Sequence, residues 1–188
     1  FNPNDVKRRK EKLTRESKLL KRIAHPAIPK LIQILDRDGF YGLVMEKMPG
    51  PSLADLLEWD HSFRKTEITA IVAQLITVMD YLARLNISHR DIKTDNILWT
   101  GEQLSLIDFG TASGVSRSNG RCNPDCCGLG DVFLRLAADC DEMTASSNDC
   151  SLAQLNLTPA QREVIKRLLY IKKPYRDFHT LTKEFNHA

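Results

Sequence analysis

The chain has 188 residues, of which 42% are hydrophobic and 27% charged, with a formal net charge of +3. This length and composition are those of one globular domain with a sizeable core. The small positive charge does not indicate nucleic-acid binding, and no apolar stretch approaches the roughly 18 residues of a membrane span. We therefore expect no nucleic-acid partner and no membrane span.

The N-terminal quarter predicts one helix followed by two strands. Residues 4–23 carry apolar side chains at helical spacing among charged ones, and a His-Pro pair follows them. Residues 31–35 and 40–45 have the composition of strands, and the turn-forming residues 36–39 lie between them. This part of the chain therefore predicts a helix packed with a hairpin.

After a Gly-Pro break at residues 50–51 the pattern is mainly helical. A short helix is predicted at 53–59, and residues 66–86 carry apolar side chains at the spacing of a long core helix. The other predicted elements, in chain order, are strands at 97–99 and 104–107, a helix at 125–138, a loop at 139–149, and helices at 159–170 and 177–186.

Five cysteines are an odd number for a disulfide framework and suit a reducing compartment, which predicts a cytoplasmic protein. Cys122, Cys126 and Cys127 lie close enough in sequence to suggest a metal site. No paired Cys-x-x-Cys set or nearby histidine completes such a site, so we expect free or partly buried thiols.

Two motifs, whose aspartates are 17 residues apart, carry the chemistry. They are His-Arg-Asp-Ile-Lys-Thr-Asp-Asn at residues 89–96 and Asp-Phe-Gly at residues 108–110. Phosphoryl transfer from ATP needs a carboxylate to orient the attacking hydroxyl, a cation for the moving phosphoryl group and oxygen ligands for magnesium. Both motifs in this order indicate ATP-dependent phosphoryl transfer.

On these motifs the chain resembles the eukaryotic-type protein kinases, and the resemblance covers about residues 5–186. It implies an α+β, protein-kinase-like fold, with a partial small lobe of one helix and two strands and a mainly helical large lobe. A single domain would span residues 1–188. The partial small lobe and hinge would occupy residues 1–48, and the large lobe residues 49–188.

The resemblance implies a role for each polar residue of the motifs. Asp91 would be the catalytic carboxylate that orients the substrate hydroxyl, and Lys93 would stabilise charge on the transferred phosphoryl group. Asn96 and Asp108 would bind magnesium, which needs few protein oxygens when phosphates and water complete its shell. A lysine at position 93 is the pattern of kinases that act on serine and threonine.

Residues outside the motifs are implied to form the nucleotide site. Glu16 matches the helix glutamate that pairs with the ATP-positioning lysine of the family. The backbone groups of Glu46 and Met48 match the hinge that bonds the adenine edge. Met45 would line the back of this pocket, and Leu98 would form its floor.

Three further residues are implied to be structural. Asp125 matches an aspartate that begins a buried helix and holds the backbone N–H groups of the catalytic loop, which here is the first motif at residues 89–96. Phe109 is expected to pack against His89 and Leu20, which would tie the Asp-Phe-Gly turn to the first helix. Arg176 matches a large-lobe arginine that usually pairs with a glutamate.

The chain departs from the family at two places. The Gly-rich phosphate loop and the lysine of the third family strand are missing before Glu16. We therefore expect either an N-terminally truncated fragment of a longer reading frame or a protein without this ATP lid. Asp108 and Asp125 are only 17 residues apart. This shortened activation segment lacks the Ala-Pro-Glu element and the peptide-docking shelf of the family.

These features predict an ATP-dependent protein kinase that transfers the γ-phosphoryl group to a serine or threonine hydroxyl of a protein substrate, with ATP and Mg²⁺ as cofactors. Two alternatives stay open. The chain could be a kinase-like binding module, weakly active or inactive, that docks on a partner kinase or another regulatory protein. It could also be a minimal kinase for a small molecule, which the missing peptide shelf would allow.

Overall fold

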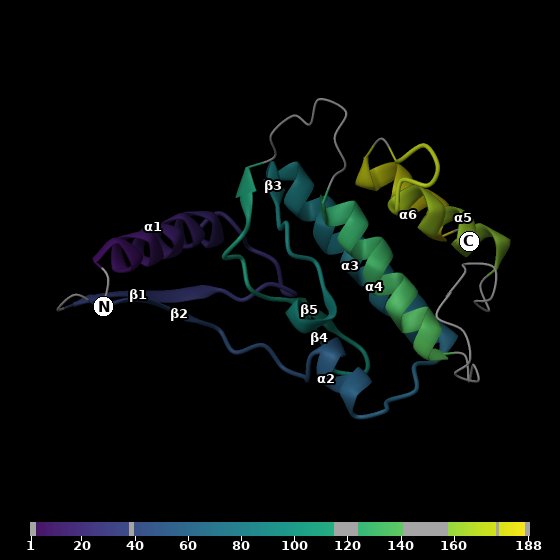
Figure 1. Cartoon of the computed structure of the whole chain (residues 1–188), viewed down its shortest axis with the longest axis horizontal. Coiled ribbons are helices and arrows are strands. Elements are labelled where there is room, and N and C mark those ends of the chain that lie inside the picture. The colour runs from purple at the N-terminus through teal and green to yellow at the C-terminus, as the bar shows by residue number, and fades with distance from the viewer. Residues whose placement is uncertain (1–2, 38–39, 115–123, 141–157, 176, 187–188) are drawn as a thin grey trace.

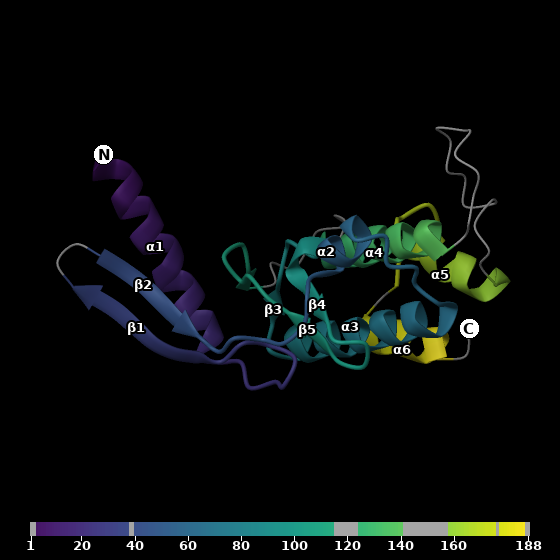
Figure 2. The same cartoon turned by 90° about the horizontal axis from the view of Figure 1, so that it is seen from below.

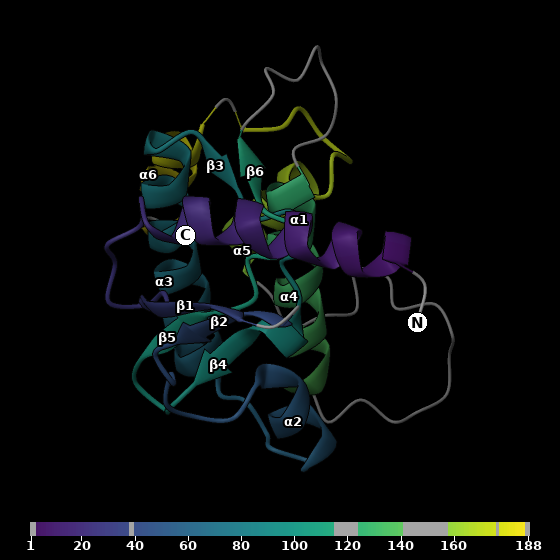
Figure 3. The same ribbon diagram turned by 90° about the vertical axis from the view of Figure 1, so that its left-hand side faces the viewer.

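The computed structural model describes residues 3–37, 40–114, 124–140, 158–175 and 177–186. Helix α1 (Pro3–Leu20) lies beside the antiparallel strands β1 (Leu31–Arg37) and β2 (Phe40–Met45), and together they project from a mainly helical body (Figures 1 and 2). Figure 3, which views the molecule from this end, shows α1 running across the axis of the body. The order of one helix, two strands and a helical body is the α+β arrangement that the sequence predicted.

Helix α1 buries one face and exposes the other. Glu16 and Leu20 are buried, whereas the basic residues near its N-terminus are exposed. The helix ends at Leu20, three residues before the predicted end, because the N–H groups of Arg22 and Ile23 bond carbonyls only three residues back. The Arg22 guanidinium then donates to the carbonyl of Leu85 at 2.9 Å, which ties this turn to the helical body.

Helix α3 (Lys65–Arg84) is the central helix of the body, and it packs against α4 and α6. Its length and apolar composition would also suffice to cross a membrane, contrary to the expectation that no stretch approaches that length. Burial inside the fold accounts for this composition. The buried side chains have the predicted helical spacing and are Ile68, Ile71, Val72, Leu75, Ile76, Val78, Met79 and Leu82.

Short elements between α3 and the C-terminal helices carry the two motifs. Strand β4 (Ile97–Trp99) pairs with β5 (Leu104–Leu106), as predicted, and the last residue of the first motif is the end of the 3-10 helix η1 (Thr94–Asn96). A second pair, β3 (Ile87–Ser88) with β6 (Ser113–Gly114), was not predicted, because two-residue strands leave no periodicity in the sequence.

The remaining helices are α2 (Leu53–Glu58), α4 (Pro124–Cys140), α5 (Pro159–Leu168) and α6 (Phe178–Asn186). Helix α4 runs alongside α3 in Figure 1 and extends two residues beyond its predicted end. The first two residues of the predicted loop at 139–149 are therefore helical. The rest of that loop, Cys122 and Arg176 lie outside the described residues.

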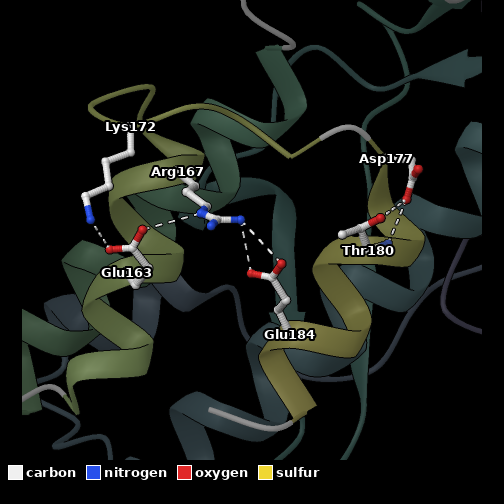
Figure 4. Close-up of polar contacts among 6 residues, drawn as sticks. All are labelled: Glu163, Arg167, Lys172, Asp177, Thr180 and Glu184. Atoms are coloured by element: carbon white, nitrogen blue, oxygen red, sulfur yellow. Dashed lines mark hydrogen bonds and ion pairs between the residues drawn. The ribbon is translucent and has the colours of Figure 1, made fainter.

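A cluster of ion pairs joins α5 to α6 (Figure 4). The Arg167 guanidinium donates to Glu163 on its own helix and to both oxygens of Glu184 on α6, at 3.2–3.4 Å. Lys172, in the connecting loop, donates to the other oxygen of Glu163. Asp177 caps α6 by accepting from the N–H and hydroxyl of Thr180. Partly exposed pairs such as these orient the two helices but contribute little stability each.

Two glycines of α4 give a matched test of how closely this helix packs on the first motif. A β-carbon at Gly128 would lie 2.5 Å from the carbonyl oxygen of Ile92 and 2.7 Å from its β-carbon. A β-carbon at Gly130 would meet side-chain atoms only, the nearest being Leu169 Cδ2 at 2.9 Å. Backbone atoms in the motif cannot yield as a leucine side chain can.

We predict that Gly128→Ala lowers the free energy of unfolding by about 1–3 kcal/mol, the usual cost of overpacking. Gly130→Ala should cost less, because the Leu169 side chain can move away from the new methyl group, whereas the gain in helix propensity of about 1 kcal/mol is common to both variants. Urea denaturation of both variants measures the difference. Equal stabilities for the two variants would contradict the close contact between α4 and Ile92.

Candidate active site

The first motif is held by a buried carboxylate at the start of α4. Asp125 is 4% exposed and accepts hydrogen bonds from the Ser88 hydroxyl at 2.8 Å, the His89 N–H at 3.0 Å and the Arg90 N–H at 2.6 Å. Arg90 has a φ of 68°, a backbone conformation that costs energy in a residue with a side chain. The bond to Asp125 helps to hold that conformation. This confirms the expectation that Asp125 binds backbone N–H groups of the loop.

The loop brings three polar side chains of the motif together. Lys93 Nζ lies 3.2 Å from Asp91 Oδ2. The Asn96 side-chain amide donates to that same oxygen and to the Asp91 carbonyl, both at 2.9 Å. The Asp91 carboxylate is therefore fixed from two sides, while about a third of its side chain stays exposed at the surface.

The charge state of Asp91 follows from these contacts. Partial burial pulls its pKa upward, but the hydrogen bonds from Lys93 and Asn96 and the Lys93 charge outweigh burial, so the pKa lies below its ordinary value of 3.8. Lys93 in turn has a raised pKa, chiefly because of its hydrogen bond to Asp91. Both groups are charged at neutral pH.

The β4–β5 pair brings Asp108 close to Asn96. Ile97 pairs with Leu106, and the N–H of Ile107 donates to the Asn96 carbonyl at 2.9 Å. Asn96 directly precedes the first strand and Asp108 follows the second with Ile107 between, so the ladder places both at the same end. The two residues that the resemblance implies as magnesium ligands are thus neighbours in space.

The free oxygens of these two residues fit a magnesium ion. Asn96 uses its amide nitrogen for Asp91, which leaves its oxygen as an acceptor. Asp108 Oδ1 accepts from the Gly110 N–H at 3.0 Å, and Oδ2 accepts no hydrogen bond in the described part of the chain. Magnesium usually takes one or two protein oxygens and completes its shell with water and phosphate. Asp108 is exposed, so such a shell could form there.

An aromatic contact anchors the second motif. The ring of Phe109 packs edge-on against His89 with centroids 4.7 Å apart, and both side chains are buried, as is Leu20 of α1. His89 Nε2 bonds the carbonyl of Ile107 at 3.1 Å, and the Thr111 hydroxyl donates to the His89 carbonyl. The expected packing of Phe109 against His89 is confirmed, and it joins the two motifs.

Glu16 faces the Asp108 carboxylate from α1. It is 7% exposed, and burial raises its pKa, with a further upward contribution from Asp108 and a downward one from Lys12. No hydrogen bond or ion pair within the described residues holds its carboxylate. Glu16 is therefore a buried acid on α1 that lies close to the Asp-Phe-Gly turn.

The predicted adenine-binding residues lie where β2 leaves the hairpin. The Glu46 N–H donates to the carbonyl of Lys30 at 2.9 Å, so only the Glu46 carbonyl is available to a ligand. The backbone groups of Met48 have no partner in the described chain. Met45 is 38% exposed at the end of the strand. One carbonyl and one free peptide group two residues apart can meet the acceptor and donor edge of a base.

Leu98 lies on the body side of this hinge. Its side chain is half-buried although both of its neighbours are buried, and Leu98 forms a β-bridge with Ser52, which follows the hinge. The N–H of Trp99 donates to the carbonyl of Pro51 at 3.0 Å. These contacts bring β4 to the hinge exit. No hydrogen bond or ion pair of the described residues joins residues 45–48 directly to the catalytic loop.

Several residues that organise the site were not identified from sequence. The Ser88 hydroxyl bonds Asp125, and the Thr111 hydroxyl bonds the catalytic loop. Neither position has a pattern that distinguishes it from other serines and threonines in turns. Lys12 is one of many charged residues of α1, and only its spacing of four residues from Glu16 indicates a shared helix face.

Cys126 and Cys127 lie on α4, whereas Cys122 lies outside the described residues. Burial raises the pKa of the Cys126 thiol, which keeps it protonated. The expectation of free thiols is wrong for Cys127, which is disulfide-bonded. Within the described ranges no group of three or more His, Cys, Asp or Glu side chains could hold a metal ion.

Comparison with known proteins adds to this geometry. Residues 2–128 match the protein kinase domain family. The chain is 34% identical over 202 residues to the probable serine/threonine-protein kinase YbdM of Bacillus subtilis, which covers all of this chain and 77% of that protein. The chain belongs to the protein kinase family.

Two other kinases match over shorter spans. The hormonally up-regulated neu tumor-associated kinase of Homo sapiens is 34% identical over 102 residues, which are 54% of this chain and 14% of that protein. Serine/threonine-protein kinase B of Synechocystis is 30% identical over 112 residues, covering 58% of this chain and 20% of that protein. This kinase chain therefore corresponds to a small part of these two relatives.

We predict that Asp125→Ala lowers the free energy of unfolding of the kinase chain by about 1–3 kcal/mol for each donor left unpaired in the core. Asp108→Ala is the matched control, because that carboxylate is exposed and accepts only the Gly110 N–H. Thermal melts without nucleotide compare the two. If Asp125→Ala melts with the parent while Asp108→Ala melts several degrees lower, the structural role of Asp125 is wrong.

We also predict a loss of stability in acid from His89. Burial lowers its pKa below the ordinary 6.5, so as the pH falls below 6.5 the unfolded chain binds a proton that the folded chain does not. The free energy of unfolding should fall by up to about 1.4 kcal/mol per pH unit for this proton. His89→Phe should show a shallower slope than the parent, because the variant has no imidazole at this buried position. A slope equal to the parent's in His89→Phe would contradict a neutral, buried His89.

Proposed function

We propose that this chain is the catalytic region of a serine/threonine-protein kinase, which transfers the γ-phosphoryl group of ATP to a protein hydroxyl. Protein kinases generally use ATP and Mg²⁺. The observation that carries the proposal is the arrangement of Asp91, Lys93 and Asn96 in one hydrogen-bonded group, with Asp108 next to Asn96. The names of the Bacillus and Synechocystis relatives favour serine and threonine as acceptors.

Asp91 would orient the substrate hydroxyl. Its lowered pKa keeps it ionised, so it accepts a hydrogen bond from the hydroxyl rather than removing the proton before transfer. The bonds from Lys93 and Asn96 both reach Oδ2, which leaves Oδ1 for the substrate. The exposed third of the side chain gives the hydroxyl access to it.

Lys93 would stabilise the charge of the transferred group. Its ammonium lies beside Asp91, where the hydroxyl and the phosphoryl group must meet, and about half of its side chain is exposed. A cation in this position acts on charge that develops during transfer. Asn96 would serve twice, by fixing Asp91 through its nitrogen and by offering its oxygen to a metal ion.

Asn96 and Asp108 would hold magnesium. When bound, the ion would neutralise charge on the nucleotide phosphates. The two ligands flank the same, open end of the β4–β5 hairpin, so their separation is fixed by the ladder rather than by a mobile loop. The Gly110 N–H donates to Oδ1 of Asp108, which leaves Oδ2 for the ion.

The adenine would lie between the hinge and β4. The Glu46 carbonyl and the Met48 backbone would bond its edge, while Met45 and Leu98 would contact its faces and rear. Glu16 would act on the phosphate side of the same cleft. In this proposal residues 1–48 form the partial small lobe and hinge, and residues 49–188 form the large lobe.

The decisive experiment measures phosphoryl transfer from radiolabelled ATP to a serine- and threonine-rich protein by the full chain. We predict that Asp108→Ala abolishes transfer and that Asp91→Ala lowers it by orders of magnitude, both with the parent's circular dichroism spectrum. Asp131→Ala is the matched control, since this aspartate is exposed on α4 and forms no hydrogen bond or ion pair with either motif within the described residues.

The other outcomes separate the alternatives. Transfer by both variants at the parent's rate would refute the assignment of Asp91 and Asp108. No transfer by the parent, together with binding to a partner kinase, would favour a binding module. Transfer to a small alcohol but not to protein would favour a small-molecule kinase.

A further inference from the structure

Lys12 places a positive charge at the Asp-Phe-Gly turn. It lies four residues before Glu16 on α1, so the two side chains share a helix face. A β-carbon on Gly110 would lie 2.8 Å from Lys12 Cε, 2.9 Å from Lys12 Nζ and 3.1 Å from Asp108 Oδ1. The ammonium of Lys12 and the carboxylate of Asp108 therefore border the same small volume above Gly110.

The Lys12 ammonium has no direct bonding partner among the described residues. No hydrogen bond or ion pair within the described residues engages Lys12 Nζ. Lys10, two residues earlier, is different, because it pairs with Asp36 on β1 at 3.0 Å. Lys12 thus reaches across the turn from an exposed position on α1 and retains its capacity to donate three hydrogen bonds.

A polyanion that enters between α1 and the catalytic loop needs a free cation there, because Glu16 and Asp108 both bring carboxylates to that region. Lys93, a cation of the catalytic loop, already forms an ion pair with Asp91. A nucleotide phosphate chain entering between the two parts would bring several negative charges, and the free ammonium of Lys12 is placed to meet them.

We propose that Lys12 is a phosphate-binding residue of the nucleotide site, reaching the α- or β-phosphate from α1. Glu16, one helical turn away, positions the ammonium electrostatically. The inference rests on the proposed kinase function and adds to it a cation from the helix itself. Its distinguishing consequence is that Lys12 contributes to binding of the phosphates and not of the nucleoside.

The first test compares ADP with adenosine, both with magnesium, by isothermal titration of the full chain. Lys12→Ala should weaken ADP binding about tenfold, the change that 1.4 kcal/mol produces, and leave adenosine binding unchanged. Lys12→Arg should recover most of the loss. Lys18→Ala removes the same charge from an exposed position on α1 and should bind ADP as the parent does.

A second test locates the ammonium chemically. An acyl-phosphate derivative of ADP acylates a lysine near its terminal phosphate, because the amine attacks the acyl carbon, an amide forms and the phosphate leaves with the bonding electrons. Peptide mass spectrometry should find the acyl group on Lys12, with labelling suppressed by excess ADP and absent from Lys18. This readout does not require tight binding or turnover.

The outcomes distinguish this inference from the proposed function. If the parent binds ADP and Lys12→Ala binds it equally well or better, Lys12 only balances Asp108, and the phosphate assignment is overturned while the kinase function stands. Labelling of other lysines without Lys12 has the same meaning. If the parent neither binds ADP nor is labelled by the probe, both proposals are overturned.

Discussion

The hydrogen bonds accepted by Asp125 are the interaction on which the rest of the site depends. One buried carboxylate at the start of α4 holds the Ser88 hydroxyl and two successive backbone N–H groups of the catalytic loop. Because α4 packs on α3 and closely approaches Ile92 through Gly128, the loop takes its place from the core of the body. The loop is therefore held in the packed interior at His89, while Asp91, two residues further on, keeps about a third of its side chain exposed.

Contacts with the first motif fix the position of the second motif. The β4–β5 ladder carries the chain from Asn96 to Asp108, and the contact of Phe109 with His89 closes the turn against the same loop. Helix α1 reaches this turn from the other part of the molecule through Glu16 and Lys12. In the proposed site the nucleotide phosphates would lie among the catalytic loop, the Asp-Phe-Gly turn and one face of α1.

The sequence predicts much of this arrangement for physical reasons that differ between elements. The long helix α3 follows from a hydrophobic period, and the motifs follow from strict spacing of groups whose chemistry is specific. The β3–β6 pair and the role of Ser88 could not be predicted, because each depends on residues far apart in the chain. The direction of Lys12 likewise depends on how α1 meets Gly110.

Relaxation of backbone amide signals by Mn²⁺ with ADP, measured by NMR on the isotope-labelled chain, tests most directly whether Asn96 and Asp108 form one cation site. Mn²⁺ replaces magnesium at oxygen ligands and broadens signals only nearby. Broadening should be strongest at Asn96, Asp108 and Gly110 and weak at Asp131, which lies on the exposed face of α4. Broadening centred instead on Glu163 and Glu184, in the cluster of ion pairs that joins α5 to α6, would contradict the site.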